Sequence, residues 1–424
     1  MTGVQTCALP IWVAAYWFRE VASGRPGVIS KVGIDTAIDP DSDGGGLNAL
    51  ARRRKTCTVR RIYIGKEDYL LYEAPKPDFA LIRATSADFR GNLDMADEAM
   101  RGTVLSIAQA TKAMPSPGKV AAQVRRVTGE PIRPRSVEVP GPLVDYVVVS
   151  PEKYHWQTGT RVLDQAFSEA YSGAPTTSES PMSPLERVVA RRVLAELLKD
   201  SGRKGSPILV NLGIGIPALV SRVSAEAGTS ERIVTVLESG QWGGVALSGV
   251  DFGVARGPFA LSTMPDMFSN FEGGTIDAAS LGFLQVGEAG DVNPSMLPGR
   301  MYGPGGFPVI AGGSPRVYFA GAFTASGTVV EARGGRLKIM KEGGKVKFVK
   351  KVYRSFFSAK QALRYGKQVL YITERAVLKL EAGGLMLKEV APGVDLERDV
   401  LGLMEFKPRI GKRVGTMDKS LFRD

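Results

Sequence analysis

The fold of this chain is decided by residues 234–244, which read V-T-V-L-E-S-G-Q-W-G-G. The aliphatic and β-branched start of this stretch is typical of a buried strand in a parallel sheet. The strand ends in a single carboxylate, Glu238, and a glycine-rich turn follows. Because open α/β sheets bind ligands beyond the carboxyl ends of their strands, Glu238 is a candidate nucleophile. The alternative is a structural glutamate at the end of a strand.

A second strand with a turn precedes this stretch. Residues 208–212 (I-L-V-N-L) predict another buried strand, and the turn G-I-G-I-P and a helix at 218–227 follow it. A strand, a glycine-rich turn and a helix in this order favour anion binding at the helix N-terminus. Pro217 stands where the dinucleotide motif G-x-G-x-x-G needs a flexible stretch, so Rossmann-type nucleotide binding is only weakly indicated.

The first part of the chain has a comparable pattern. Residues 58–64 and 69–72 alternate like a hairpin. Buried strands are predicted at 79–83 and 143–149, a further strand at 120–127, and a helix at 97–111. Alternating strands and helices predict a parallel sheet. In addition, residues 78–93 resemble residues 279–293, since both contain an apolar strand followed by an acidic residue, a glycine and an Asn or Asp. This partial repeat suggests two related halves that face each other across a cleft.

A segment rich in Pro, Ser and Gly at 172–184 separates the two parts, and an amphipathic helix is predicted directly after it, at 184–200. We therefore expect an N-terminal domain over 12–172, a linker over 173–184 and a C-terminal domain over 185–424, which carries Glu238. A chain of 424 residues fits two or three domains at roughly 150 residues per domain. The expected fold class is α/β, with two similar Rossmann-like domains of mostly parallel strands and the active site between them.

The composition is that of an ordinary globular protein, with 44% hydrophobic and 23% charged residues. No apolar run reaches the ~18 residues of a membrane span. The two cysteines, Cys7 and Cys57, are too few for a disulfide framework or a zinc cluster, which favours a reducing cytoplasm. The net charge of +12 is compatible with nucleic acid or with anionic small ligands such as CoA.

Three other features favour structural roles. The acidic loop at 39–46 lacks the glutamate that an EF-hand calcium site needs. His155, the only histidine, has no G-x-S-x-G motif to complete a catalytic triad. The six lysines of residues 338–351 alternate like a solvated strand face, and few aromatic residues lie near them for nucleic-acid binding. No metal site is expected.

Residues 1–11 (M-T-G-V-Q-T-C-A-L-P-I) resemble a translated sequencing adapter, so they are expected to be non-native. A signal peptide is the competing explanation, but the segment lacks a basic start and a long apolar stretch.

Several motifs together resemble family I CoA-transferases of the propionate (acetate/acetoacetate) type. They are V-N-L-G-I-G-I-P at 210–217, L-E-S-G-x-x-G-G at 237–244, G-x-G-G-F at 303–307, Y-I-T-E-R-A-V at 371–377, A-P-G-V-D-L-E-R-D-V-L at 391–401 and, in the first half, A-L-I-R-x-T-x-A-D-x-x-G-N. These motifs occur in the family's order and spread over nearly all of residues 12–424, which is more specific than any single glycine-rich loop.

The resemblance implies ping-pong transfer of CoA between carboxylic acids, through an acyl-glutamyl anhydride and a glutamyl-CoA thioester on Glu238. It also implies that Asn211 and the amide of Gly306 bind the oxyanion or thioester. The glycines that would approach CoA are Gly243, Gly244 and Gly305. CoA would then be a substrate, with no tightly bound cofactor.

The implied partners are acyl-CoA and short-chain carboxylic acids, as in short-chain fatty acid and ketone body metabolism, in a cytoplasmic homo-oligomer without nucleic acid or membrane. Trp242, Phe271 and Phe307 are candidates for limiting the acyl size. Family members begin well ahead of Trp12, so we expect a truncated chain with little activity. The alternatives are an acyl-CoA hydrolase or a sugar-phosphate isomerase on the same fold, and a non-catalytic binding module.

Overall fold

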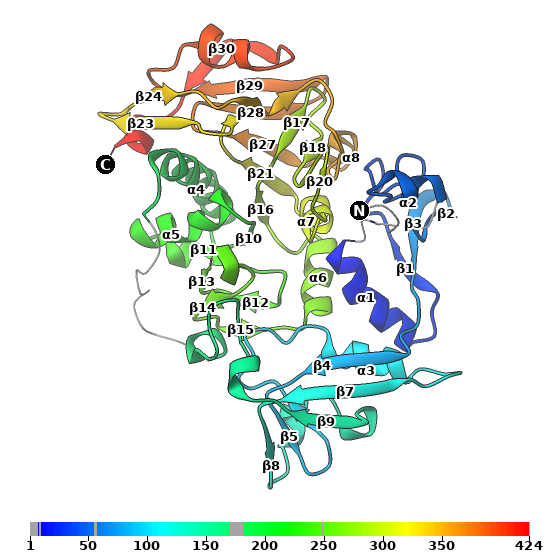
Figure 1. The fold of residues 1–424 in the computed structure, drawn as a ribbon. Coiled ribbons are helices and arrows are strands. Elements are labelled where there is room, and N and C mark those ends of the chain that lie inside the picture. Colours follow the sequence, from blue (N-terminus) through cyan, green and yellow to red (C-terminus); the bar gives the residue numbers. More distant parts are fainter. Residues whose placement is uncertain (1–6, 8–9, 55–56, 170–180, 248, 424) are drawn as a thin grey trace.

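The computed structural model describes residue 7 and residues 10–54, 57–169, 181–247 and 249–423. Its largest element is an eight-stranded sheet in the second half of the chain (Figure 1). The strand order is β11 (Ile233–Thr235), β10 (Ile208–Leu212), β16 (Ala278–Leu281), β21 (Arg316–Ala320), β27 (Gln368–Ile372), β28 (Ala376–Glu381), β29 (Gly384–Val390) and β30 (Arg409–Thr416). The first five strands run parallel, which confirms the α/β class.

Both faces of this sheet are covered, as parallel sheets require. The helices around it are α4 (Pro184–Lys204), α5 (Leu219–Glu226), α6 (Met264–Glu272), α7 (Phe307–Gly313) and α8 (Ala359–Arg364). Two neighbouring residues of β21 pack into the helix layers on opposite faces of the sheet, because successive side chains of a strand point to opposite faces. Tyr318 packs in a cluster with α4 and α5, whereas Phe319 packs in a cluster with α6 and α7.

Helix α4 shows how local sequence sets an element's limits. Ser183 accepts a hydrogen bond from the Glu186 N–H, and the Glu186 carboxylate accepts one from the Ser183 N–H, which forms a capping box. The helix ends at Gly205, whose φ of 69° is left-handed and suits glycine. The predicted helix at 184–200 is therefore confirmed and extends to Lys204.

The first half contains a smaller parallel sheet of β4 (Phe79–Arg83), β7 (Lys119–Val124) and β9 (Tyr146–Val149). One face packs against α3 (Val104–Lys112). Two predictions are wrong here. The helix expected from Asp97 begins at Val104, because Gly102 has a left-handed φ of 59°. The strand expected to be buried at 143–149 is exposed along all of β9, because no described element covers its outer side.

A third unit contains the predicted hairpin, formed by β2 (Val59–Ile64) and β3 (Glu67–Glu73), and extended by β1 (Gly27–Ser30). Helix α2 (Ala49–Arg54) belongs to the same region (Figure 1). Helix α1 (Ile11–Ala22) contacts β1, α3 and α6, so it joins this unit to both sheets.

The partial repeat of the sequence has a structural counterpart. β5 (Ser86–Asp88) pairs antiparallel with β6 (Leu93–Asp94) and parallel with β8 (Arg126–Thr128). In the same way, β17 (Gln285–Gly287) pairs antiparallel with β18 (Val292–Asn293) and parallel with β26 (Phe348–Val349). The two halves therefore contain the same three-stranded motif. Most of the linker expected at 173–184 lies outside the described residues, as do most of residues 1–11.

The remaining elements are short. Two-stranded sheets are formed by β12 (Gln241–Trp242) with β15 (Ala260–Leu261), β13 (Val245–Ala246) with β14 (Ala255–Arg256), β19 (Met296–Leu297) with β20 (Arg300–Met301), β22 (Thr324–Ala325) with β25 (Lys345–Val346), and β23 (Val329–Arg333) with β24 (Arg336–Lys341). Helix α9 (Leu396–Asp399) follows β29.

The lysine-rich run at 338–351 is only partly a solvated face. Five of its lysines are exposed, but Lys347 is buried, with its Nζ atom 3.9 Å from the centre of the Phe283 ring. Burial lowers the pKa of Lys347 to about 8. The sequence prediction is wrong for this residue, because Lys347 immediately precedes the short buried strand β26 and points inward.

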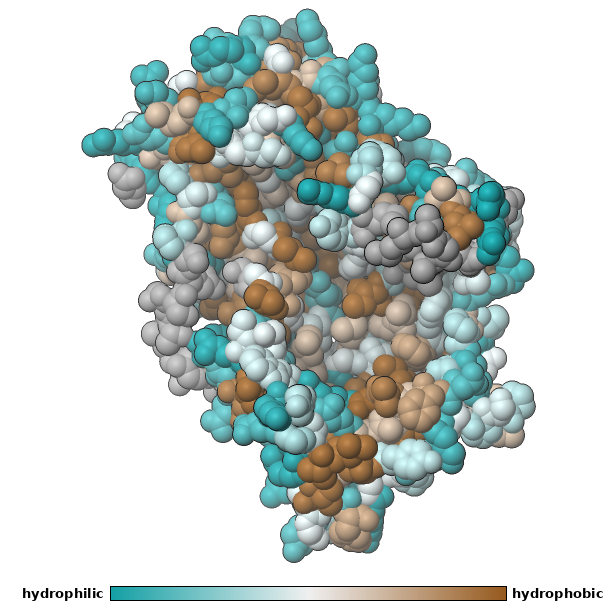
Figure 2. All heavy atoms as spheres, in the orientation of Figure 1, coloured by the Kyte–Doolittle hydropathy of each residue, from teal (hydrophilic) through white to brown (hydrophobic). Residues whose placement is uncertain are grey.

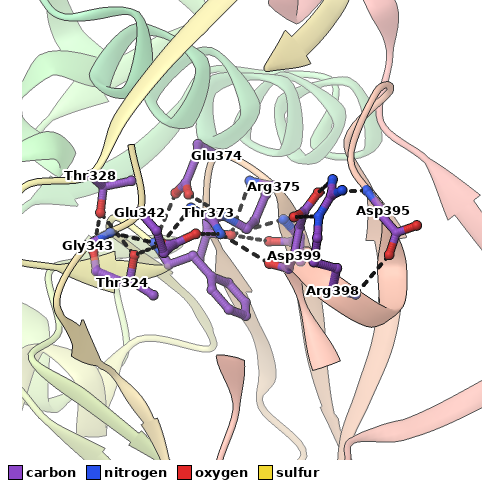
Figure 3. Close-up of polar contacts among 12 residues, drawn as sticks. Thr324, Thr328, Glu342, Gly343, Thr373, Glu374, Arg375, Asp395, Arg398 and Asp399 are labelled. Carbon is purple, nitrogen blue, oxygen red and sulfur yellow. Dashed lines mark hydrogen bonds and ion pairs between the residues drawn. The ribbon is translucent and has the colours of Figure 1, made fainter. Parts of the chain in front are cut away.

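Two of the family-like motifs meet at a buried ion network at the turn between β27 and β28 (Figure 3). Arg375 is fully buried, and its guanidinium donates to Glu374 and Glu342, each at 2.7 Å. It also donates to the backbone carbonyl of Asp399 at 3.1 Å. The T-E-R motif therefore ties α9 to the carboxyl edge of the main sheet.

The chain also carries one disulfide, between Cys7 and Cys57, which the sequence analysis did not foresee. Among the described residues, no helix is both long and apolar enough to cross a membrane.

Candidate functional site

Glu238 lies in a tight turn at the carboxyl end of β11. Beyond β11, Val236 bridges to Trp242, and the Leu237 N–H donates to the Gln241 carbonyl at 2.9 Å. Gly240 closes the turn with a φ of 113°, and a methyl group there would lie 2.0 Å from the Ser262 carbonyl oxygen. Only glycine fits this position, so the S-G step after Glu238 lets the chain turn sharply at the edge of the sheet.

Asn211 is the side chain that contacts Glu238 directly. It lies in β10, next to β11, and is fully buried. Its Nδ2 atom donates to the Val236 carbonyl at 2.9 Å and to Glu238 Oε2 at 3.3 Å. Its Oδ1 atom is buried and accepts no hydrogen bond within the described structure. Asn211 therefore has one donor on the carboxylate and one acceptor free for a ligand.

Gly306 also lies beside Glu238, but it belongs to a different segment of the chain. It is the residue before α7, and a methyl group on it would lie 3.8 Å from Glu238 Cγ, 3.6 Å from Phe268 and 3.1 Å from Ile310. The first amides of a helix have no partner within the helix, so they are available to an anion. The structure thus brings together Glu238, Asn211 and Gly306, as the resemblance implied.

The environment of Glu238 raises the pKa of its carboxyl group. Burial is the main cause, and the hydrogen bonds from its own backbone and from Asn211 oppose it. No cation balances the charge, since neither Lys nor Arg lies within 4.0 Å of this carboxylate in the described part of the chain. A desolvated carboxylate of this kind is a better nucleophile than a fully hydrated one.

Gln241 is a site residue that the sequence analysis did not identify. Its side chain is fully buried, and its Nε2 atom donates at 2.7 Å to the carbonyl of Ala99, in the first half of the chain. Its Oε1 atom accepts from the Ala255 N–H. The turn that carries Glu238 is therefore held against the first half, and no local pattern could have indicated this contact.

The proposed CoA glycines lie in two places. Gly305 is exposed beside Gly306, and its carbonyl accepts from the Ile11 N–H at 3.2 Å. Gly243 and Gly244 line a separate cavity of about 260 Å³ with Phe259, and Glu238 is not among its lining residues. Close packing explains these two glycines, since a methyl group on Gly243 would lie 2.4 Å from Phe259. Their contact with CoA stays a prediction.

The three aromatic residues that were candidates for limiting the acyl size differ in their surroundings. Phe271 is fully buried, Phe307 stacks on Phe319 at 5.9 Å, and Trp242 donates to Ser262 at 2.9 Å. Phe268 lies nearest to the Gly306 position and was missed, although it lies one turn before Phe271 on α6.

His155 lies apart from this group, as expected for a structural residue. Its ring is fully buried, and its Nε2 atom lies 2.8 Å from Glu98 Oε1. Burial lowers its pKa. Within the described residues, no group of three His, Cys, Asp or Glu side chains is arranged to hold a metal ion.

Known proteins resemble this chain in sequence over most of its length. The sequence model of the family described as Coenzyme A transferase matches residues 7–150. The chain is 39% identical to a caffeate CoA-transferase of Acetobacterium woodii, over 98% of this chain and 78% of that protein. It is 36% identical to the acetate CoA-transferase YdiF of Escherichia coli K12, over 98% of this chain and 76% of that protein.

A solved structure is also similar. The acyl-CoA transferase YdiF of Escherichia coli O157:H7, as a thioester complex with CoA, matches with a TM-score of 0.87 and 33% identity. The match covers 99% of this chain and 77% of that one. Likeness of this extent, in sequence and in fold, means that the chain belongs to the coenzyme A transferase family and is a CoA-transferase.

Proposed function

We propose that the protein transfers CoA from a short-chain acyl-CoA to a carboxylic acid, with Glu238 as the covalent nucleophile. The observation that carries this proposal is the arrangement of the Glu238 carboxylate, which has the Asn211 amide at 3.3 Å and Gly306 beside it. Two hydrogen-bond donors next to a desolvated carboxylate are what acyl transfer to that carboxylate needs.

The reaction proceeds by four acyl transfers. Glu238 attacks the acyl-CoA carbonyl, the C–S bond breaks, and a mixed anhydride and CoA thiolate form. The thiolate attacks the Glu238 carbonyl of the anhydride, which releases the first acid and leaves a glutamyl-CoA thioester. A second acid attacks this thioester and expels the thiolate, which then attacks the acyl carbonyl of the new anhydride. The new acyl-CoA leaves, and Glu238 is free again.

No general base takes part, because each step exchanges one anion for another. This agrees with a site that holds no histidine, since His155 is engaged with Glu98. Each tetrahedral intermediate carries an oxyanion, for which the Asn211 amide and the Gly306 N–H are the proposed donors. Loss of one such donor costs about 3–4 kcal/mol of barrier.

The free Oδ1 atom of Asn211 fits CoA as a substrate. A buried acceptor without a partner is costly, and the pantetheine arm of CoA carries two amide N–H groups that could satisfy it. Gly243, Gly244 and Gly305 remain the proposed backbone contacts to CoA. Phe268, with Phe307 and Trp242, is proposed to limit the acyl group to a short chain.

A trapping experiment tests this proposal. The enzyme is incubated with acetyl-CoA, reduced with borohydride and mapped by mass spectrometry. Reduction should convert the side chain of Glu238 to an alcohol, and a label on another residue would refute the assignment. Glu238→Asp should retain the fold but lose most activity, because the shorter arm misplaces the nucleophile.

Hydrolysis of acyl-CoA without an acceptor would contradict the proposed transfer, since a glutamyl thioester can also react with water. A transferase releases free CoA slowly and needs an acceptor acid, whereas a hydrolase turns over acetyl-CoA in water alone.

We further propose domains over 12–172 and 185–424, a homo-oligomer and a cytoplasmic location, on the basis of the family resemblance. Size measurement in solution tests the oligomer.

A further inference from the structure

A large cavity lies away from Glu238, around the C-terminal end of α7. Its volume is about 500 Å³, which is in the range of small-molecule sites. It is enclosed by parts of the chain that are far apart in sequence, namely β1 and the loop after it, the ends of α6 and α7, and α8. Glu238, Asn211 and Gly306 are not among its lining residues.

Most of the cavity wall is apolar or aromatic. The side chains of this kind include Val32, Ile34, Phe356, Phe357 and Tyr365. Gly273 and Gly313, at the ends of α6 and α7, lie in the same wall. Such a surface would receive the apolar body of a ligand, and the polar groups within it would fix the ligand's orientation.

One of these polar groups is the carboxylate of Glu272, the last residue of α6. Its partner is the Ser30 hydroxyl, and no Lys or Arg of the described chain lies within 4.0 Å of it. Burial raises the pKa of Glu272, which shows that the charge is poorly compensated. The C-terminal end of a helix also favours positive charge. This side of the cavity therefore suits a cation.

The other group is the amine of Lys367. It donates to the Ser314 carbonyl at 2.7 Å, and no carboxylate of the described chain lies within 4.0 Å of it. Burial lowers its pKa to about 8. The remaining lysine of the wall is already occupied, because Lys31 pairs with Glu67 at 2.6 Å. Lys367 is thus the amine that an anion could reach.

The two groups lie on connected segments. A methyl group on Gly274, two residues after Glu272, would lie 3.4 Å from the Gly313 carbonyl oxygen, and Ser314 is the next residue. The two charged groups form no ion pair with each other, since the hydrogen-bond partner of Glu272 is the Ser30 hydroxyl and that of Lys367 is the Ser314 carbonyl. A ligand with a single charge would leave one of them without a partner, which is unfavourable in a buried site.

We propose that this cavity binds an apolar α-amino acid or a similar zwitterion, with its ammonium group on Glu272 and its carboxylate on Lys367. The proposal concerns a second site and does not rest on the role of Glu238.

Three matched probes test it by calorimetric titration of the full chain. L-Phenylalanine carries both charges, 3-phenylpropionate lacks the ammonium group, and 2-phenylethylamine lacks the carboxylate. We expect the amino acid to bind about tenfold or more tightly than either analogue, because each analogue loses a charged hydrogen bond. Equal binding of 3-phenylpropionate, or no binding of L-phenylalanine, would overturn the proposal.

Two near-isosteric variants assign the charges. Glu272→Gln should weaken L-phenylalanine binding about tenfold while leaving 3-phenylpropionate unchanged, and Lys367→Met should weaken it while leaving 2-phenylethylamine unchanged. Lys360→Met is the matched control, since Lys360 lies on α8, shortly before Lys367 in the chain, with its side chain 79% exposed and outside the cavity wall. Equal effects of Lys360→Met and Lys367→Met would contradict the assignment.

A third variant separates this site from the proposed active site. In Glu238→Gln, L-phenylalanine should bind with unchanged affinity, whereas glutamyl-CoA formation should be lost. If L-phenylalanine no longer binds to Glu238→Gln, the probe occupies the acyl site, and the second site is refuted. If binding persists while Glu238→Gln keeps its transferase activity, the proposed function fails and the second site stands.

Discussion

At the scale of single residues, the proposed nucleophile Glu238 carries a cost in stability. Its pKa in the folded protein lies above the value in the unfolded chain, so folding favours the protonated form. The loss of folding stability is therefore complete when the pH is above the pKa of Glu238 in the folded protein. It disappears as the pH falls from that pKa towards the pKa in the unfolded chain. We expect Glu238→Gln to unfold at a higher temperature than the parent protein at neutral pH.

Thermal unfolding between pH 8 and pH 4.5 checks this expectation. The advantage of Glu238→Gln should shrink as the pH falls through the raised pKa. Asn211→Ala removes a donor that lowers this pKa, so the acid limb of the activity profile should move to higher pH in that variant. If Glu238→Gln is less stable than the parent protein at pH 8, burial of the Glu238 carboxylate does not reduce stability.

Gln241 is expected to position the turn that holds the nucleophile. Gln241→Met removes both side-chain hydrogen bonds and leaves the Ala99 carbonyl and the Ala255 N–H buried without partners. Each unsatisfied group costs about 1–3 kcal/mol. We expect lower stability and a fall in kcat with little change in KM.

The matched control is Gln285→Met, because Gln285 accepts hydrogen bonds from Asn293 and from the Tyr353 N–H away from Glu238. It should lower stability without lowering kcat per folded molecule. An equal fall in kcat for both variants would show that Gln241 acts through stability alone.

Gly306 should be sensitive to a single added methyl group. Its φ of −82° is allowed for alanine, so Gly306→Ala should fold with only a small loss of stability. The methyl would lie 3.8 Å from Glu238 Cγ and occupy space that the acyl group needs. We expect kcat/KM for acetyl-CoA to fall by about tenfold or more, as for loss of one well-placed contact.

Gly305→Ala separates the effect of an added methyl group on stability from its effect on catalysis. Gly305 has a left-handed φ of 58° and open space around its Cα, so alanine there should cost about 1–2 kcal/mol of stability from backbone strain. Because Gly305 is proposed to contact CoA and not the acyl group, kcat per folded molecule should change less than in Gly306→Ala, and the kinetic loss should appear in KM for acetyl-CoA. Steady-state kinetics together with urea unfolding distinguish the two variants, and a larger kinetic loss for Gly305→Ala would oppose our assignment.

At the scale of secondary-structure elements, Arg375 links the turn between β27 and β28 to α9. It joins Glu374, Glu342 and the α9 backbone within a buried network (Figure 3). Removing one partner of a buried ion pair leaves uncompensated charge and costs about 3–5 kcal/mol. We therefore expect Arg375→Met to lower the free energy of unfolding by an amount of this order.

Arg398→Met is the control on the neighbouring element. Arg398 pairs with Asp399, but its side chain is 77% exposed, and exposed pairs contribute about 0–1 kcal/mol. Urea unfolding measures both variants. Similar losses for the two would mean that the buried network does not act as a unit.

At the scale of the whole molecule, one face of the β4-β7-β9 sheet is unusually apolar for a surface. Phe79, Leu81, Tyr146 and Val148 share this face by the register of the three strands, and each is more than half exposed. In Figure 2, hydrophobic residues gather near the lower end of the molecule, where Figure 1 places β9. Parallel sheets are normally covered on both faces, so this surface should associate.

We expect Leu81→Lys, at a position that is 78% exposed, to reduce concentration-dependent association without lowering stability. Light scattering over a range of concentrations measures this effect. Val250→Lys, equally exposed but in a loop of the second half, is the control. If both variants associate as strongly as the parent, the sheet face does not drive association.

Local sequence alone determined much of this protein. The strand that precedes Glu238, the strand that carries Asn211, helix α4 and the repeated strand motif all follow from periodicity and glycines. These signals act over a few residues, so they can be read in order along the chain. The pairing of Glu238, Asn211 and Gly306 came instead from family resemblance.

Only the tertiary structure decided the contacts between distant segments. Gln241 holds Ala99 across 142 positions, Lys347 turns inward beside Phe283, and Glu272 shares a cavity with Lys367. Residues of β9, which the sequence predicted to be buried, are exposed because no described element packs over them. Burial and pairing depend on which segment folds against which, and neither periodicity nor composition carries that information.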